Sequence, residues 1–234
     1  MSTVRRIIRR LMAERRFASA RFWSNDELRR LAPLFVGDVV NVSGWDDRDK
    51  EGSYYRRYFS SARTYSITNY RGDRGLQGVP GEHYLDLTDE VPEPLRQGFD
   101  VAFNHTTLEH VFEVRKAFGN LCALSRDAVI VVVPFAQVQH EGLDWQDYWR
   151  FTPTCMRTLF RENGLEVVYE SASPQRDAAI YLLFVASRNP GRWSGRLQAY
   201  REIGGVGKWI GRSLVRTAYA RVRNAILRRR EKPG

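Results

Sequence analysis

The sequence has few cysteines and no long apolar run. Its two cysteines, Cys122 and Cys155, can form neither a disulfide framework nor a zinc site of four thiolates. The longest uninterrupted apolar stretches, 128–136 and 178–186, have nine residues each, whereas a membrane-spanning helix needs roughly 18. The G-x-S-x-G, P-loop and C-x-x-C patterns are also missing, which removes the sequence basis for hydrolase, kinase and redox functions.

The sequence does contain enough apolar material for a folded core. Its 234 residues suit one α/β domain with appended helices. Hydrophobic residues make up 43% of the chain and aromatic residues 12%, a composition that excludes wholesale disorder. The N-terminal stretch alternates Arg with apolar residues and lacks the separate apolar segment of a secretory signal. We therefore expect a cytoplasmic protein.

Positive charge gathers at the two ends of the chain. Residues 1–22 carry seven Arg and one Glu, and residues 188–234 carry thirteen basic and two acidic residues. The middle, 23–187, carries 17 basic and 24 acidic residues, so the net charge of +10 comes from the ends. Basic ends attract the phosphates of lipid headgroups or of nucleic acid. The acidic middle argues against nucleic acid as a partner.

Both basic ends show helical periodicity. Apolar residues occupy positions 4, 7, 8, 11 and 12, and the same spacing returns over 209–227. Basic amphipathic helices suit an anionic membrane surface, here the inner face of the membrane. The apolar stripes could instead pack on the core or on a second copy of the chain, giving a homo-oligomer. The basic residues could also bind RNA. We expect three parts: a basic N-terminal helix (1–24), an α/β domain (25–190) and a basic C-terminal helical extension (191–234).

Strand and helix patterns alternate through the middle of the chain. Strands are expected at 36–43, 64–69, 83–87, 99–104, 127–133, 165–169 and 178–187, and helices at 107–124 and 152–163. The continuous apolar run at 127–133 is typical of a strand covered on both faces. A short turn before the last strand indicates an antiparallel hairpin. The sequence thus predicts an α/β fold: a doubly wound, mostly parallel, seven-stranded Rossmann-like sheet with a terminal antiparallel hairpin.

Polar residues follow the ends of the first four predicted strands. Residues 41–47 follow the first strand, Asn69 the second, Asp86 the third, and Asn104 and His105 the fourth. In doubly wound sheets the ligand lies beyond the carboxyl ends of the strands. The pattern therefore predicts a small-molecule or nucleotide site at this edge.

Residues 36–171 resemble the class I S-adenosylmethionine-dependent methyltransferases, in particular the type 11 group. The sequence FDVAFN at 99–104, followed by LEHV at 108–111, is similar to that group's fourth strand and the start of the next helix. The stretch 117–134 is similar to the helix and fifth strand that come after. The segment with His, then DYWRFTP, at 140–153 resembles methyltransferase-like proteins of bacterial surface-polysaccharide clusters.

The resemblance implies S-adenosylmethionine as cofactor and methyl transfer to a hydroxyl of a surface glycan or lipid-linked sugar. It places the cofactor against Ser43, Gly44, Asp46, Asn69, Asp86, Leu87 and Asn104. Imidazole is the side chain that ordinarily titrates nearest neutrality. His105 and His140 are therefore the candidate catalytic bases. The substrate is expected to contact the loop after the fifth strand, at Trp145, Asp147, Tyr148 and Arg150, although the acid and the Arg could instead form a structural ion pair.

Two features differ from the family pattern and keep other functions open. The first loop contains one glycine, Gly44, where the family has several, and the second strand ends in Asn69 where the family has an acid. These differences motivate a second hypothesis, a non-catalytic scaffold of glycan assembly at the membrane. A third hypothesis is an RNA methyltransferase whose basic ends hold phosphate.

No metal site is predicted from the sequence. His140, Glu141 and Asp144 lie in one loop, but their spacing matches no recognised zinc signature. Glu109 and His110 are expected to serve the start of the following helix, through capping and hydrogen bonding.

Overall fold

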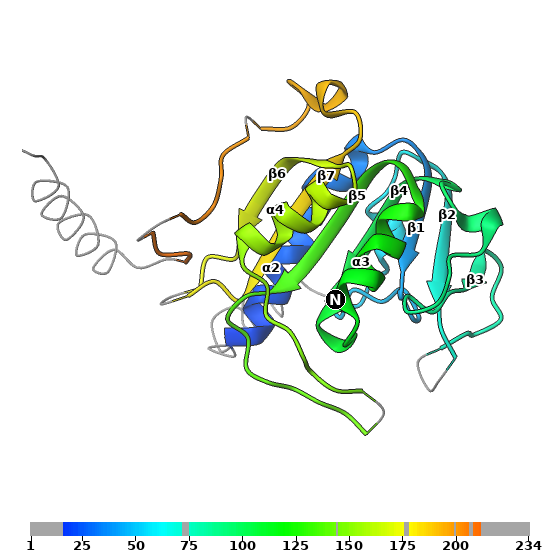
Figure 1. Cartoon of the computed structure of the whole chain (residues 1–234), viewed down its shortest axis with the longest axis horizontal. Helices are drawn as coiled ribbons and strands as arrows, with labels where there is room; N and C mark the ends of the chain where they lie inside the picture. Colours follow the sequence, from blue (N-terminus) through cyan, green and yellow to red (C-terminus); the bar gives the residue numbers. More distant parts are fainter. Residues whose placement is uncertain are drawn as a thin grey trace, which may run out of the picture.

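A seven-stranded sheet forms the centre of the computed structural model, which describes residues 16–71, 75–143, 145–175, 178–198, 200–205 and 208–211. Its strands are β1 (Gly37–Val42), β2 (Ala62–Asn69), β3 (Glu82–Tyr84), β4 (Phe99–His105), β5 (Ser125–Pro134), β6 (Glu166–Ala172) and β7 (Tyr181–Ser187). Their order is β3-β2-β1-β4-β5-β7-β6, parallel from β3 to β5, with β7 antiparallel to both neighbours (Figure 1). The expected sheet and its terminal hairpin are confirmed.

Helices cover both faces of this sheet. α3 (Val114–Ala123) and α4 (Pro153–Glu162) lie on one face, and α2 (Arg16–Leu31) lies on the other (Figure 1). Successive strand residues point to opposite faces, so Val40 packs in the core under α3 and α4 while Val39 packs in the core under α2. This double cover explains why the residues of the apolar run in β5 are buried.

The start of α4 follows its sequence signals. The side-chain oxygen of Thr152 accepts the backbone N–H of Cys155, and Pro153 occupies the first turn, where a missing N–H costs nothing. The helix ends at Glu162, just before Asn163 and Gly164. The predicted bounds of 152–163 are therefore right to within one residue at each end.

The helix expected over 107–124 begins only at Val114, and this part of the prediction is wrong. A short 3-10 turn, η4 (Leu108–His110), precedes it. In a continuous helix the carbonyl of Glu109 would accept an N–H four residues later. It instead accepts the backbone N–H of Tyr148 at 2.8 Å. A distant loop thus holds this turn outside the helix.

The connection from β1 to β2 is a loop over 43–61 that contains a 3-10 turn, η2 (Tyr55–Arg57), in place of an α-helix. Its centre is the carboxylate of Asp47, which is fully buried. That carboxylate accepts hydrogen bonds from Asn41, Arg56 and Tyr65. These bonds fix the loop against the carboxyl ends of β1 and β2.

The basic ends lie largely outside the described residues. α2 runs through position 24 to Leu31 and packs Leu28 and Leu31 into the core. Residues 1–15 and 212–234, where most of the two expected basic helices fall, are not described. Among the described helices, none combines the length and apolarity needed to cross a membrane.

Candidate functional site

The register of the parallel strands brings the predicted cofactor residues to one edge. Val42, the last residue of β1, pairs with Thr68 of β2 on one side and with Asn104 of β4 on the other. Asn69, the last residue of β2, pairs with Tyr84 of β3. The carboxyl ends of four neighbouring strands therefore meet, as the sequence predicted.

The loop after β1 turns sharply with little glycine. Ser43 and Trp45 have φ angles of +56° and +48°, a left-handed conformation that favours glycine. Between them, a Cβ added to Gly44 would lie 2.6 Å from the side-chain nitrogen of Asn41. The N–H of Gly44 donates to the carbonyl of Thr68 at 3.2 Å. Ser43 and Trp45 thus adopt the backbone conformation that glycines would supply in a glycine-rich loop. Gly44 stands where the loop packs most closely on β1.

Asn69 holds this loop in place. Its side-chain oxygen accepts the N–H of Trp45 at 2.7 Å, and its side-chain nitrogen donates to the carbonyl of Trp45 at 3.0 Å. The same nitrogen donates to Glu82 at 2.6 Å. The amide predicted to bind the ribose is thus engaged with the backbone of the cofactor loop, and its side chain is almost fully buried.

Local contacts position three further residues of the predicted cofactor site. Asp86 accepts both the N–H and the hydroxyl of Thr88 at 2.8 Å, which forms a tight turn after β3. Leu87 is buried, and its carbonyl accepts a side-chain hydrogen bond from α3. Asp46 forms an ion pair with the exposed Arg48 at 3.0 Å. Asp86 and Leu87 are fixed by the fold, whereas Asp46 lies on the loop surface.

Asn104 presents an unsatisfied acceptor at the end of β4. Its side-chain nitrogen donates to the carbonyl of Val42 at 2.9 Å. Its side-chain oxygen is buried and has no hydrogen-bond partner in the described part of the chain. Buried polar atoms are almost always paired, so this acceptor is a candidate contact for a ligand at the carboxyl edge of the sheet.

His105 lies beneath α2 with both ring nitrogens occupied. Arg21 donates to Nδ1 at 2.7 Å, and Nε2 lies 2.9 Å from the hydroxyl of Ser24, which itself donates to the carbonyl of Arg21. Burial, and then the positive charge of Arg21, hold the pKa of His105 well below its usual value. The imidazole is therefore neutral, and its lone pair points at a guanidinium.

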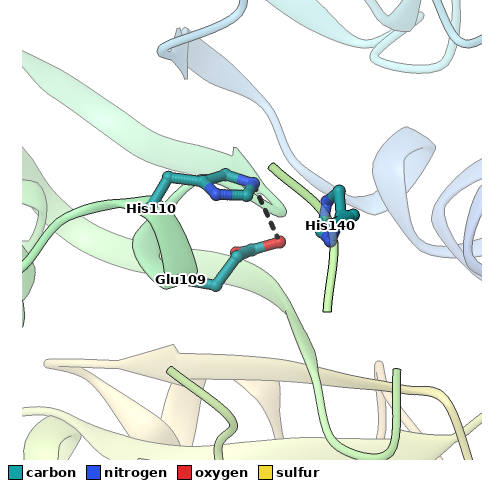
Figure 2. A group of neighbouring side chains, drawn as sticks. All are labelled: Glu109, His110 and His140. Atoms are coloured by element: carbon teal, nitrogen blue, oxygen red, sulfur yellow. Dashed lines mark ion pairs between the residues drawn. The ribbon is translucent and has the colours of Figure 1, made fainter. Parts of the chain in front are cut away.

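Glu109, His110 and His140 form a cluster beside this edge, here called the Glu-His-His cluster (Figure 2). Glu109 and His110 come from η4, and His140 faces them from the long loop after β5. The Glu109 carboxylate is fully buried, and neither oxygen has a hydrogen-bond partner among the described residues. Burial raises the pKa of Glu109 to about 8. His110 Nε2 lies 3.8 Å from this carboxylate.

Asp147 orients His140 from the same loop. Its carboxylate lies 3.3 Å from His140 Nδ1 and accepts the backbone N–H of His140 at 2.8 Å. It also forms a bidentate pair with Arg150, both distances being 2.6 Å. Burial acts to raise the pKa of Asp147, but the Arg150 guanidinium and the His140 N–H outweigh it and lower the pKa to about 2. Arg150 thus makes the ion pair left open by the sequence, and it does so with the acid that positions a candidate base.

Aromatic rings line the approach to the Glu-His-His cluster. The Trp145 ring lies 4.4 Å from that of His110 and 5.2 Å from that of His140. Tyr148 and Phe112, both exposed, pack edge to face at 5.3 Å. One predicted substrate residue, Trp145, therefore lies beside the predicted base His140, and a second, Tyr148, packs on Phe112.

The sequence missed the roles of three residues at this site. Glu109 and His110 fit a helix start, and only the fold brings them to His140, which lies 30 residues further along the chain. Arg21 falls in the expected basic N-terminal helix, yet its guanidinium is turned inward onto His105. A cavity of about 710 Å³ lies elsewhere, between β6 and the segment around Ile203, and includes none of the predicted residues.

Comparison with known proteins gives structural matches only. No protein-family model and no curated protein matches the chain. The candidate methyltransferase in a complex with the Haloferax volcanii Trm112 methyltransferase activator matches with a TM-score of 0.51 and 13% identity, over 70% of this chain and 88% of that one. An S-adenosylmethionine-dependent methyltransferase from Clostridium acetobutylicum matches with a TM-score of 0.50 and 7% identity, over 70% and 90%.

A third match leads to the same conclusion. A candidate S-adenosylmethionine-dependent methyltransferase from Listeria monocytogenes has a TM-score of 0.50 and 13% identity, over 73% of this chain and 98% of that one. At such identities the likeness establishes the fold alone. The chain has the α/β fold of the class I methyltransferases.

Proposed function

We propose that this chain transfers a methyl group from S-adenosylmethionine to a hydroxyl of a surface glycan or of its lipid-linked precursor. One observation carries the proposal. At the carboxyl edge of the sheet, where this fold binds ligands, Asn104 and Glu109 present buried acceptors without partners in the described structure. His140 lies beside Glu109, with the Asp147 carboxylate 3.3 Å from its Nδ1.

The residues at this edge fit the cofactor. The orphan oxygen of Asn104 is suited to an ammonium or hydroxyl donor, and Asp86 is suited to accept from the exocyclic amine of adenine beside Leu87. The loop at Ser43 and Gly44 would carry the methionine part, with Asp46 and Asn69 at its border. When bound, S-adenosylmethionine supplies a methyl group that the sulfonium charge has already activated.

The chain's own task is then to align the acceptor hydroxyl and remove its proton. His140 is the better placed base, since the Asp147 carboxylate holds its Nδ1 side, as a base-orienting acid does. His105 is the weaker candidate, because Arg21 occupies its lone pair and because burial, together with the charge of Arg21, lowers its pKa.

The surroundings of His140 support a sugar acceptor. Trp145 offers aromatic surface next to the base, and Tyr148, which is 43% exposed, offers further aromatic surface in the same loop. Acidic side chains in the same loop can accept hydrogen bonds from sugar hydroxyls. Arg150 would act by holding Asp147. Its guanidinium could also contact an acceptor that carries a phosphate.

The basic ends support a position at the inner face of a membrane, near lipid-linked sugars. Sedimentation with anionic liposomes and a gel shift with RNA separate the two phosphate sources. Binding to liposomes with no RNA shift is the expected result. An RNA shift with no liposome binding would favour the RNA methyltransferase hypothesis instead.

Isothermal titration with S-adenosylhomocysteine tests the cofactor site. We expect micromolar binding, abolished by Gly44→Trp, whose side chain meets Asn41, and weakened about tenfold by Asp86→Ala, for a lost charged hydrogen bond. Asp89→Ala, an exposed acid three residues away, is the matched control. The absence of binding at millimolar ligand in a folded protein would sink the methyltransferase proposal.

A specific observation favours a second candidate function, a non-catalytic binding protein of glycan assembly. Asn69 stands where the family has an acid, and both ends of its amide are engaged with Trp45. Transfer of tritium from labelled S-adenosylmethionine to a lipid-linked glycan fraction distinguishes the two. Glycan binding without transfer, in a protein that binds no S-adenosylhomocysteine, would establish the second function.

A further inference from the structure

We infer that the Glu-His-His cluster is a binding site for one divalent transition-metal ion of the zinc type. Glu109, His110 and His140 each offer one ligand atom, and these atoms all lie within 4.8 Å of one another (Figure 2). In a tetrahedral zinc site, with bonds of roughly 2.0–2.1 Å, ligand atoms lie roughly 3.3 Å apart. The 3.8 Å between Glu109 and His110 is thus close to a coordinating separation. Small rotations of the side chains would bring all three ligand atoms to coordinating distances.

The buried carboxylate is an independent reason to expect a cation. Glu109 is fully buried, and neither carboxylate oxygen has a partner in the region that the structure describes. An isolated ionised carboxylate is very costly to bury, whereas one that binds a metal ion is compensated. The side chain is also aimed at two imidazoles.

The outer contacts fix the imidazoles as metal ligands. His110 Nδ1 lies 2.7 Å from the carbonyl oxygen of Gln146, so Nδ1 carries the proton and Nε2 presents its lone pair toward Glu109. The Asp147 carboxylate lies 3.3 Å from His140 Nδ1, and the side-chain amide nitrogen of Gln137 lies equally close to it. These neighbours face Nδ1 and leave Nε2 for a metal. A carbonyl or a carboxylate behind each histidine is the usual outer shell of a metal site.

The ligand set indicates which ion binds. Two imidazoles and one carboxylate suit Zn²⁺, Co²⁺, Mn²⁺ or Fe²⁺, whereas Mg²⁺ and Ca²⁺ prefer sites built from oxygen. Three protein ligands leave at least one position for a water or substrate oxygen, as catalytic zinc sites do. Trp145 lies beside both histidines, so a substrate on that ring could reach the open position.

The role of the ion rests on the proposed function, while the site itself does not. A cation here would bind the acceptor hydroxyl and lower its pKa, and the proton would leave to bulk water. His140 would then be a ligand, and the ion would replace it as the group that activates the acceptor.

Cobalt titration of the full chain, stripped of metal and free of S-adenosylmethionine, tests the site. We expect one Co²⁺ per chain with the visible absorption bands of a four- or five-coordinate site, displaced by Zn²⁺ and not by Mg²⁺. Glu109→Gln, His110→Ala and His140→Ala should each weaken binding at least tenfold. His83→Ala, on β3, is the matched control among the four histidines.

The outcomes are separable from those of the cofactor titration. A folded protein that binds neither Co²⁺ nor Zn²⁺ saturably overturns the inference, as does unchanged binding in all three variants. Glu109→Gln keeps the size of the side chain, so circular dichroism should show it folded even if a histidine variant is not. S-adenosylhomocysteine binding without metal binding refutes the metal site alone. Metal binding without S-adenosylhomocysteine binding refutes the proposed function alone.

Discussion

The two ends of strands β1 and β4 differ in how far their polar side chains are paired. At the amino ends, Asp38 and Asp100 are both paired: Asp38 accepts from Arg63, Thr64 and Arg126, and Asp100 accepts from Arg126 and the backbone N–H of Asp38. At the carboxyl ends, Asn104 and Glu109 keep orphan oxygens. The two acids at the amino ends are thus satisfied within the fold, whereas Asn104 and Glu109 keep open acceptors at the edge where we propose that a ligand binds.

The largest loss of stability is expected when a buried, fully paired carboxylate near the carboxyl end of β1 is removed. This variant shows which polar groups at that end are paired and which are open. The Asp47 carboxylate accepts from Asn41, Tyr65 and Arg56. Asp47→Ala leaves these donors unpaired, and we expect the free energy of unfolding to fall by about 3 kcal/mol. Urea denaturation measures it.

Asp46→Ala is the matched control for this variant. Asp46 forms an ion pair with the exposed Arg48, and exposed pairs contribute about 0.5 kcal/mol. Equal losses in the two variants would contradict the view that Asp47 anchors the loop.

A matched pair of acid-to-amide variants tests the comparison directly. Asp100→Asn weakens bonds to a guanidinium and should lower the free energy of unfolding by about 1–2 kcal/mol. Glu109→Gln replaces a buried carboxyl group whose oxygens have no partner among the described residues and whose pKa is about 8. Above that pH it removes an unpartnered charge, and it should leave the free energy of unfolding of the metal-free protein unchanged or raise it by about 1 kcal/mol. Thermal and urea unfolding of both variants measure the difference.

The opposite ranking of these two variants would break the comparison. A loss of several kcal/mol in Glu109→Gln would mean that the carboxylate has a structural partner. Asp89→Asn, at an exposed position, corrects for the general effect of removing one negative charge.

The smallest effect is expected in acid. Hydrogen bonds from Arg63 and Thr64 lower the pKa of Asp38 to about 2, from a value near 4 in the unfolded chain. A lowered pKa stabilises the fold above the unfolded value, and that contribution is lost as the pH falls from about 4 to about 2. Urea midpoints across this range should fall less steeply in Asp38→Asn than in the unchanged protein. Parallel curves would show that the pairs at this end contribute nothing.

The sequence predicted the elements whose signals are local. The apolar run of β5 identified a doubly covered strand, and Thr152 with Pro153 marked the start of α4 to within a residue. The edge that holds Asn69 and Asn104 followed from the parallel order of the strands. Each of these features depends on periodicity or on neighbours in the chain.

The rest depended on contacts between distant segments. Glu109 continues a helical pattern, and only the N–H groups of Tyr148 and Trp149, which take its carbonyl, show why no helix forms there. The meeting of Glu109 with His140 follows from that same contact. The role of Arg21 required knowledge of where α2 lies over β4.

The two attachments of Glu109 have a thermodynamic consequence. Its carbonyl accepts the backbone N–H groups of Tyr148 and Trp149, while its carboxylate is part of the Glu-His-His cluster. Any ligand of the carboxylate that fixes the turn also favours the docked loop, and by reciprocity the docked loop favours that ligand by the same factor. If the cluster binds a ligand as proposed, Glu109 couples the position of the loop at 145–148 to the occupancy of the cluster, so that neither equilibrium can be shifted without the other.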